Sequence, residues 1–218
     1  DELLEINKGI MKDVVGKVKT TSPNAILIIV SNPLDAMVMV AYRESGFPKE
    51  RVIGMAGVLD SARMRAFIAM ETGKSVKDVD AFVLGGHGDT MVPMMSHAKV
   101  GGTPLADLLS QEKIDAIVER TKNGGAEIVQ YLKMGSAYFA PAASIMDMVE
   151  SILKDQKRTL PCAAYLDGEY GYSGIFIGVP VVLGAGGVTK VVELQLTEEE
   201  RALFNKTAEH VKELVEKL

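Results

Sequence analysis

Residues 25–46 have the sequence AILIIVSNPLDAMVMVAYRESG. The first part is a continuous apolar run, which is typical of a parallel strand buried on both faces. Pro33 ends this run, and the segment after it has the pattern of a helix that ends at Gly46, a residue suited to a C-cap. A buried strand followed directly by a helix is the repeating unit of a wound α/β sheet. The sequence therefore predicts an α/β fold.

The segments on either side continue this alternation. Apolar residues at three- and four-residue spacing predict an amphipathic helix at the N-terminus: Leu3, Ile6, Ile10, Val14 and Val18. Downstream, the pattern predicts a brief strand at 51–57, a helix at 59–73 with Met64, Phe67 and Ile68 on one face, and a strand at 76–86.

The sequence pattern of the second half of the chain predicts helices followed by strands. Residues 113–155 have a helical pattern that we expect to break near Gly124-Gly125 and again at 135–141. Strands are predicted at 160–168 and within 175–194, and Thr197 with Glu200 forms a capping-box pattern that begins a last helix.

Composition excludes several classes of function. The chain has 218 residues and a formal net charge of -5, without a basic cluster, so we expect no nucleic-acid partner. No apolar run reaches the roughly 18–20 residues of a membrane helix, and we expect no membrane partner. The single cysteine, Cys162, suits a reducing compartment and predicts a cytoplasmic protein. Neither a Cys pair nor a metal-binding His spacing is present, so no metal is expected.

The start of the sequence is unusual. It lacks an initiator Met, and a helical pattern is already under way at the first residues. We interpret this as an N-terminally incomplete chain.

A glycine cluster, GAGG at 184–187, is a candidate phosphate loop. A dinucleotide-binding loop must follow a strand and open a helix, because the phosphates bind at the helix N-terminus. Here the strand-like VTKVVEL follows, so the sequence favours a hairpin turn between two strands.

A second glycine-rich segment, GGHGD at 85–89, is the strongest candidate for catalysis. It contains His87, and histidine is the side chain best suited to move a proton near neutral pH. Asp60 and Arg63 share one side of a predicted helix, where a carboxylate could orient a histidine and a guanidinium could bind a carboxylate. The alternatives are an exposed turn histidine and a surface ion pair.

Asn32 follows the buried strand. Ligands of wound α/β sheets gather at the carboxyl ends of the strands, so Asn32 is a candidate ligand-binding residue. A simple Asn-Pro turn is the alternative.

Together these motifs resemble the lactate/malate dehydrogenase family. SNPLDAM (31–37), GFPKERVIGMAGVLDSARMR (46–65) and LGGHGDTMVP (84–93) occur in the family's order and spacing, and GSAYFAPAAS (135–144) and GVPVVLGAGGVTKVVEL (178–194) extend the likeness along nearly the whole chain. Within the family the chain is most similar to the bacterial malate dehydrogenases of the lactate-dehydrogenase-like group. Gly86 and Thr90 occupy positions where lactate enzymes usually carry Glu and Ser.

The resemblance implies an NAD-dependent oxidation of (S)-malate to oxaloacetate and its reverse. His87 would accept the proton of the 2-hydroxyl group, Asp60 would orient His87, and Arg63 would bind a substrate carboxylate. Asn32 would contact the reacting oxygen. Asn7, Val30, Ser31 and Asn32 would lie along the cofactor.

The resemblance also implies a domain organisation and partners. Residues 1–55 would be the remaining half of a Rossmann-type NAD-binding domain, and residues 56–218 would be the α+β substrate domain. The chain would act on a small dicarboxylic 2-hydroxy or 2-oxo acid and would form a homodimer or homotetramer. The glycine loop for NAD and the loop that selects malate over lactate would precede residue 1. A lactate dehydrogenase and a non-catalytic assembly partner therefore remain as alternatives.

Overall fold

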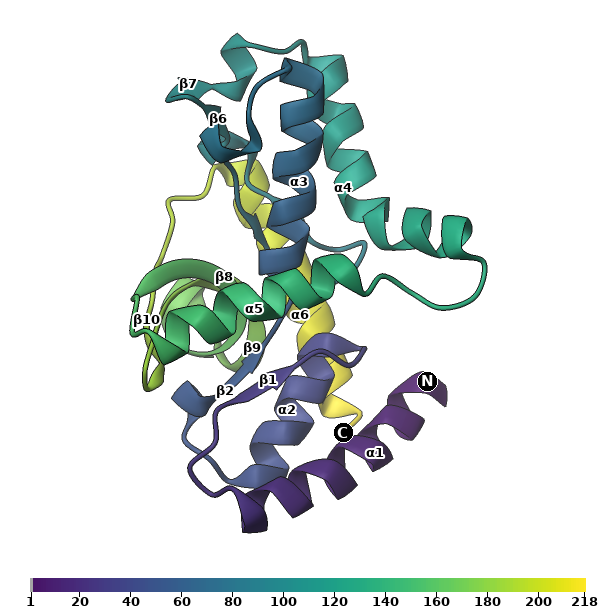
Figure 1. The fold of residues 1–218 in the computed structure, drawn as a ribbon, viewed down its shortest axis with the longest axis vertical. Helices are drawn as coiled ribbons and strands as arrows, with labels where there is room; N and C mark the ends of the chain where they lie inside the picture. The colour runs from purple at the N-terminus through teal and green to yellow at the C-terminus, as the bar shows by residue number, and fades with distance from the viewer. Residues whose placement is uncertain (1) are drawn as a thin grey trace.

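A five-stranded mixed sheet forms the centre of the computed structural model, which describes residues 2–218 (Figure 1). The strand order is β1-β2-β8-β9-β10, with β1 at Leu27–Ile29, β2 at Val52–Gly54, β8 at Arg158–Asp167, β9 at Ser173–Gly184 and β10 at Gly187–Val191. Strands β1 and β2 are parallel, as expected for a wound unit, whereas β8, β9 and β10 are antiparallel to their neighbours. The predicted α/β class is confirmed.

The first two helices pack together beside β1 and β2 (Figure 1). Helix α1 spans Glu2–Thr21, and α2 spans Leu34–Ser45. Gly46 ends α2 in the left-handed conformation, with φ of 64°, as predicted. The N-terminal helix exists, but its predicted apolar stripe is exposed: Leu3, Ile6, Ile10 and Val14 are each about half accessible. The buried face of α1 instead carries Leu4, Met11 and Val15, which pack against α2.

Helix α3, at Gly57–Thr72, follows β2 and buries Met64 and Ile68 completely. The strand predicted at 76–86 is two short strands, β3 at Val79–Asp80 and β4 at Val83–Leu84. They separate because they have different partners: β3 pairs with β6, and β4 pairs with β5. The partners are β5 at Val92–Pro93, β6 at Lys99–Val100 and β7 at Thr103–Pro104. Short 3-10 helices lie at Lys49–Arg51, Val76–Asp78, Met95–His97, Leu105–Asp107 and Glu169–Gly171.

The long helical region forms two helices. Helix α4 spans Gln111–Leu132 and α5 spans Phe139–Leu153, so the predicted break at 135–141 is confirmed. The break predicted at Gly124-Gly125 is wrong, because α4 continues through both glycines. A helix interior tolerates glycine at a cost of about 1 kcal/mol. Figure 1 shows α4 changing direction along its length, which glycines in a helix permit.

The GAGG segment is a hairpin turn, as predicted. Gly184 at the end of β9 pairs with Gly187 at the start of β10. The last helix, α6, spans Glu198–Glu216, and the capping box of Thr197 and Glu200 is present. Its Phe204, Ala208 and Val211 are buried in the main core.

Three hydrophobic clusters hold the elements together: one between the long strands, α3, α5 and α6, one around α1 and α2, and one around α3, α4 and the short strands. The sheet passes from β2 to β8 through the pair Gly54–Ala163. It therefore crosses the boundary predicted at residue 55, and the division into residues 1–55 and 56–218 stays a prediction. No helix within residues 2–218 has the length and apolar character needed to cross a membrane.

Candidate active site

His87 and Asp60 form the centre of the candidate site. Nδ1 of His87 lies 2.8 Å from Oδ2 of Asp60, although the two residues are 27 positions apart. Asp60 sits in the first turn of α3 and is 1% exposed, while His87 follows β4. The contact with Asp60 occupies Nδ1, which leaves Nε2 of the ring to exchange a proton with a ligand.

Arg63 completes a connected set of three residues. Its Nη1 lies 3.4 Å from Oδ1 of Asp60, one helical turn along α3. Burial lowers the pKa of His87, but the hydrogen bond and charge of Asp60 outweigh this effect, with help from the charge of Asp35, so the pKa is raised overall. The structure therefore brings together the three side chains that the sequence singled out for proton transfer and carboxylate binding.

The main chain of the His87 loop is held from inside by two residues that sequence reasoning missed. The His87 N–H donates to Oδ2 of Asp35 at 3.0 Å, and the Gly86 N–H donates to Oγ1 of Thr207 at 3.0 Å. The Thr207 hydroxyl in turn donates to Oγ1 of Thr90 at 3.0 Å. A signal was available for Asp35, because a carboxylate in the apolar segment 34–41 is unusual.

Gly86 is required by this packing. A Cβ atom at position 86 would lie 3.0 Å from Oγ1 of Thr207 and 3.3 Å from Oδ2 of Asp35. Glycines beside a catalytic residue can let a ligand approach the backbone closely. At Gly86 the close neighbours are instead the protein's own polar side chains, whereas the Cβ position of Gly88 faces open space.

The residues expected along a cofactor lie at the carboxyl end of β1. The Asn7 side chain donates to the backbone carbonyl of Asn32 at 2.6 Å, which joins α1 to the turn after β1. Val30, Ser31 and Asn32 are exposed. Three residues after Asn32, Asp35 contacts the main chain of His87, so this turn and the His87 loop are neighbours in space.

A cavity of about 480 Å³ adjoins Arg63 between α3, α4 and the start of α5. Its lining is mostly apolar and includes Phe67, Ile128 and Tyr138. A Cβ atom on Gly124 of α4 would lie only 3.1 Å from Cδ of Arg63. This glycine was expected to break the helix. Its observed effect is to let the Arg63 side chain lie against the main chain of α4.

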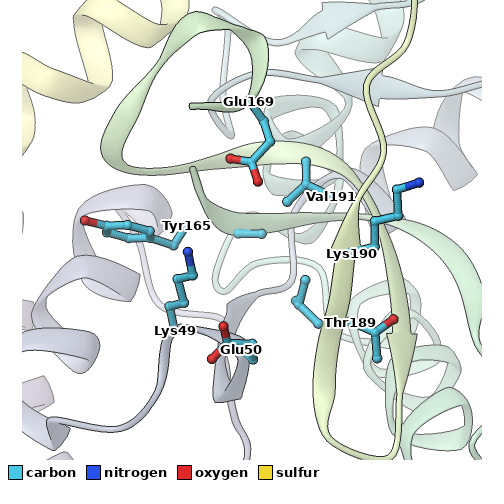
Figure 2. A pocket seen from close by; sticks show the side chains of 9 residues that line it. Lys49, Glu50, Tyr165, Glu169, Thr189, Lys190 and Val191 are labelled. Carbon is cyan, nitrogen blue, oxygen red and sulfur yellow. The ribbon is translucent and has the colours of Figure 1, made fainter. Parts of the chain in front are cut away.

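A smaller cavity of about 120 Å³ lies elsewhere, between β8, β10 and the 3-10 helix at Lys49–Arg51 (Figure 2). Its charged residues have both signs, and Lys49 is already paired with Asp167 at 2.8 Å. It lacks the connected His, Asp and Arg set that marks the first site. Within residues 2–218, no cluster of three His, Cys, Asp or Glu residues could hold a metal ion.

Comparisons with known proteins match the chain to one family. The family model for the lactate/malate dehydrogenase α/β C-terminal domain matches residues 57–218, and the model for the NAD-binding domain of the same family matches residues 1–54. Malate dehydrogenase of Heliobacterium modesticaldum is 60% identical over 215 residues, which are 99% of this chain and 70% of that protein.

Solved structures have the same fold. Malate dehydrogenase from Salinibacter ruber superposes with a TM-score of 0.97 at 51% identity and covers 99% of this chain and 70% of its own. Lactate dehydrogenase from Cryptosporidium parvum, solved with lactic acid and nicotinamide adenine dinucleotide, has a TM-score of 0.97 at 45% identity. The match covers 99% of this chain and 69% of the lactate dehydrogenase chain. This chain belongs to the lactate/malate dehydrogenase family.

Proposed function

We propose that this chain is an NAD-dependent malate dehydrogenase, which oxidises (S)-malate to oxaloacetate and catalyses the reverse reaction. The observation that carries the proposal is the hydrogen bond between His87 and the buried Asp60, with Arg63 on the same carboxylate. This arrangement offers a base for a hydroxyl proton beside a cation for a substrate carboxylate. A base and a carboxylate-binding cation suit the oxidation of a 2-hydroxy acid.

His87 is the proton acceptor in the proposed mechanism. In the oxidation direction, its unprotonated Nε2 takes the proton of the substrate hydroxyl, and the oxygen becomes the carbonyl oxygen of oxaloacetate. Asp60 holds the ring through Nδ1 and stabilises the imidazolium that forms. In the reverse direction the protonated ring returns the proton to that oxygen.

Arg63 and Asn32 position the substrate. The guanidinium of Arg63 can bind a carboxylate through two parallel hydrogen bonds. The Asn32 amide donates to the reacting oxygen and helps to polarise the ketone in the reverse reaction. Together the two residues fix the acid end and the reacting end of the substrate.

The cofactor residues of the proposal are Asn7, Val30, Ser31 and Asn32. They fit a nicotinamide group because exposed main chain and the exposed, apolar Val30 lie at the carboxyl end of a parallel strand, where α/β proteins bind such ligands. NAD bound there would supply the acceptor for the hydride that leaves C2 of the hydroxy acid.

Lactate dehydrogenase is the second candidate, because a solved lactate dehydrogenase shares this fold at 45% identity. We favour malate because relatives at 54–60% identity over nearly the whole chain are malate dehydrogenases. The test is the oxidation of NADH with oxaloacetate and pyruvate offered in parallel. Faster turnover of oxaloacetate supports the proposal, and faster turnover of pyruvate supports the alternative.

We further propose that the protein acts in the cytoplasm as a homodimer or homotetramer. Cys162 is buried and forms no disulfide within residues 2–218, which suits a reducing compartment. Large apolar side chains are exposed on α4, on α5 and on the segment between them: Tyr131, Met134, Phe139, Met146 and Leu153. Exposed apolar side chains of this size favour self-association. Sedimentation analysis checks this, and a folded assembly without turnover on either acid would support the non-catalytic alternative.

A further inference from the structure

Asp35 is a buried carboxylate to which the sequence assigned no role. It lies near the N-terminus of α2, is 4% exposed, and is surrounded by the apolar residues of that helix. Its Oδ2 accepts the backbone N–H of His87 at 3.0 Å. Its Oδ1 is buried and has no hydrogen-bond partner among the residues that the structure describes.

A half-satisfied buried carboxylate is costly for a fold. Ionised carboxylates are almost never buried unless they are paired, and an unsatisfied buried oxygen destabilises the folded state. An amide or a hydroxyl group could also accept the His87 N–H, without a charge. The presence of a carboxylate at this position therefore requires a reason beyond the single hydrogen bond.

The charged surroundings of Asp35 supply that reason. The titratable groups that interact with it are His87 and Asp60, and Arg63 lies beyond them on α3. Asp60 is on the ring side of His87 and Asp35 is on its main-chain side, so two carboxylates flank one histidine.

We propose that Asp35 is a positioning residue for His87: its Oδ2 fixes the main chain of the histidine, and its negative charge stabilises the protonated ring. The proposal rests on the proposed function in one respect, because a proton relay gives the protonated state of His87 its importance. The N-terminal end of α2 favours a negative charge at this place.

The ionisation behaviour agrees with this geometry. Burial raises the pKa of Asp35 to about 6, against the lowering effects of the His87 N–H and the His87 charge. Asp35 is therefore ionised at neutral pH. The charge of Asp35 also contributes, after that of Asp60, to the raised pKa of His87.

The test replaces the charge and keeps the hydrogen bond. In Asp35→Asn the amide oxygen can still accept the His87 N–H. The pKa of the His87 ring is measured by NMR titration of the protein without substrate or cofactor. We expect it to fall by roughly half a unit or more, because an opposite charge has been removed. An unchanged His87 pKa in folded Asp35→Asn would overturn the electrostatic part of the proposal.

Thr207→Val is the matched control. Thr207 accepts the N–H of the adjacent Gly86 at the same 3.0 Å, but it is uncharged. Its loss loosens the same loop, and we expect the pKa of His87 to stay at the wild-type value. An equal fall in both variants would mean that loop packing, not charge, sets the pKa of His87, and would overturn the proposal.

A second measurement does not depend on the folding of Asp35→Asn. The Asp35 carboxyl is titrated by carbon NMR in the wild type and in His87→Asn. Loss of the imidazolium should raise the pKa of Asp35, whereas identical titrations would contradict coupling. Neither titration uses turnover, so the two proposals can fail separately. If Asp35 and His87 titrate as coupled groups but His87 is not needed for turnover, the proposed function is refuted and this inference stands.

Discussion

A Cβ atom on Gly124 would lie 3.1 Å from Cδ of Arg63, so the bare main chain of α4 forms the surface against which this arginine lies. The glycine occupies the interior of a 22-residue helix, where it costs stability. In return, the Arg63 side chain can lie between α3 and α4 while its Nη1 stays 3.4 Å from Asp60. The geometry of the proposed carboxylate-binding residue thus depends on a helix that follows it by some sixty positions.

Gly124→Ala should weaken substrate binding without unfolding the protein. Alanine adds about 1 kcal/mol of helix propensity, but its Cβ displaces Arg63 by a few tenths of an ångström. We expect a several-fold higher KM for oxaloacetate and an unchanged or higher melting temperature. Steady-state kinetics and thermal unfolding check the two expectations.

Gly125→Ala is the control for this prediction. A Cβ atom at Gly125 would meet only Nη1 of Arg63, at 4.0 Å, which is an ordinary contact. The Gly125→Ala variant gains the same helix propensity without displacing Arg63, so its KM for oxaloacetate should stay near the wild-type value. Equal KM values for both alanine variants would show that Gly124 does not set the position of Arg63.

His87→Asn should lower turnover by at least about 100-fold, the usual contribution of general acid-base catalysis. Binding of NADH should be largely retained, because the proposed cofactor residues lie at the end of β1. Turnover and NADH fluorescence titrations measure the two effects. His210→Asn, at an exposed histidine of α6, should keep normal turnover. Normal turnover in His87→Asn would refute the proton-relay role.

Asp60→Asn should move the pH-rate profile to lower pH. Burial lowers the pKa of His87, and Asp60 is the main group that raises it, so removing the carboxylate lowers that pKa. Oxidation of malate needs the neutral ring, and its rate rises with pH through the pKa of His87. In the variant this rise should occur at lower pH, with a smaller maximum rate. A pH-rate profile that keeps its wild-type position would show that Asp60 does not raise the pKa of His87.

Asp35→Asn should change the pH dependence of folding stability. The folded-state pKa of Asp35 is raised from 3.8 to about 6, so the stabilisation from its protonated form is complete below pH 3.8 and is lost as pH rises through 6. The 2.2-unit difference corresponds to roughly 3 kcal/mol. We expect the free energy of unfolding of the wild type, relative to the variant, to fall by most of this amount between pH 4 and 7, because the carboxyl of the unfolded chain is already partly ionised at pH 4. Urea unfolding measures it, and a difference that is constant with pH would contradict the prediction.

The sequence determined the elements whose signals are local. The apolar run and Pro33 predicted β1 and the start of α2, and the spacing of Thr197 and Glu200 predicted the capping box of α6. Asp60 and Arg63 are three positions apart, so helical geometry alone placed them together. Continuous motifs along the chain also identified the family.

Contacts between distant segments became visible in the folded structure alone. Asp35 and His87 are 52 positions apart and Gly86 and Thr207 are 121 apart, so no periodicity could relate them. Gly124 was predicted to break the helix because glycine has a low helix propensity. The sequence does not show that the side chain of Arg63 occupies the space beside this glycine. The apolar stripe predicted on α1 is exposed in the structure. A periodic pattern shows that a helix has an apolar face, but packing decides which face is covered.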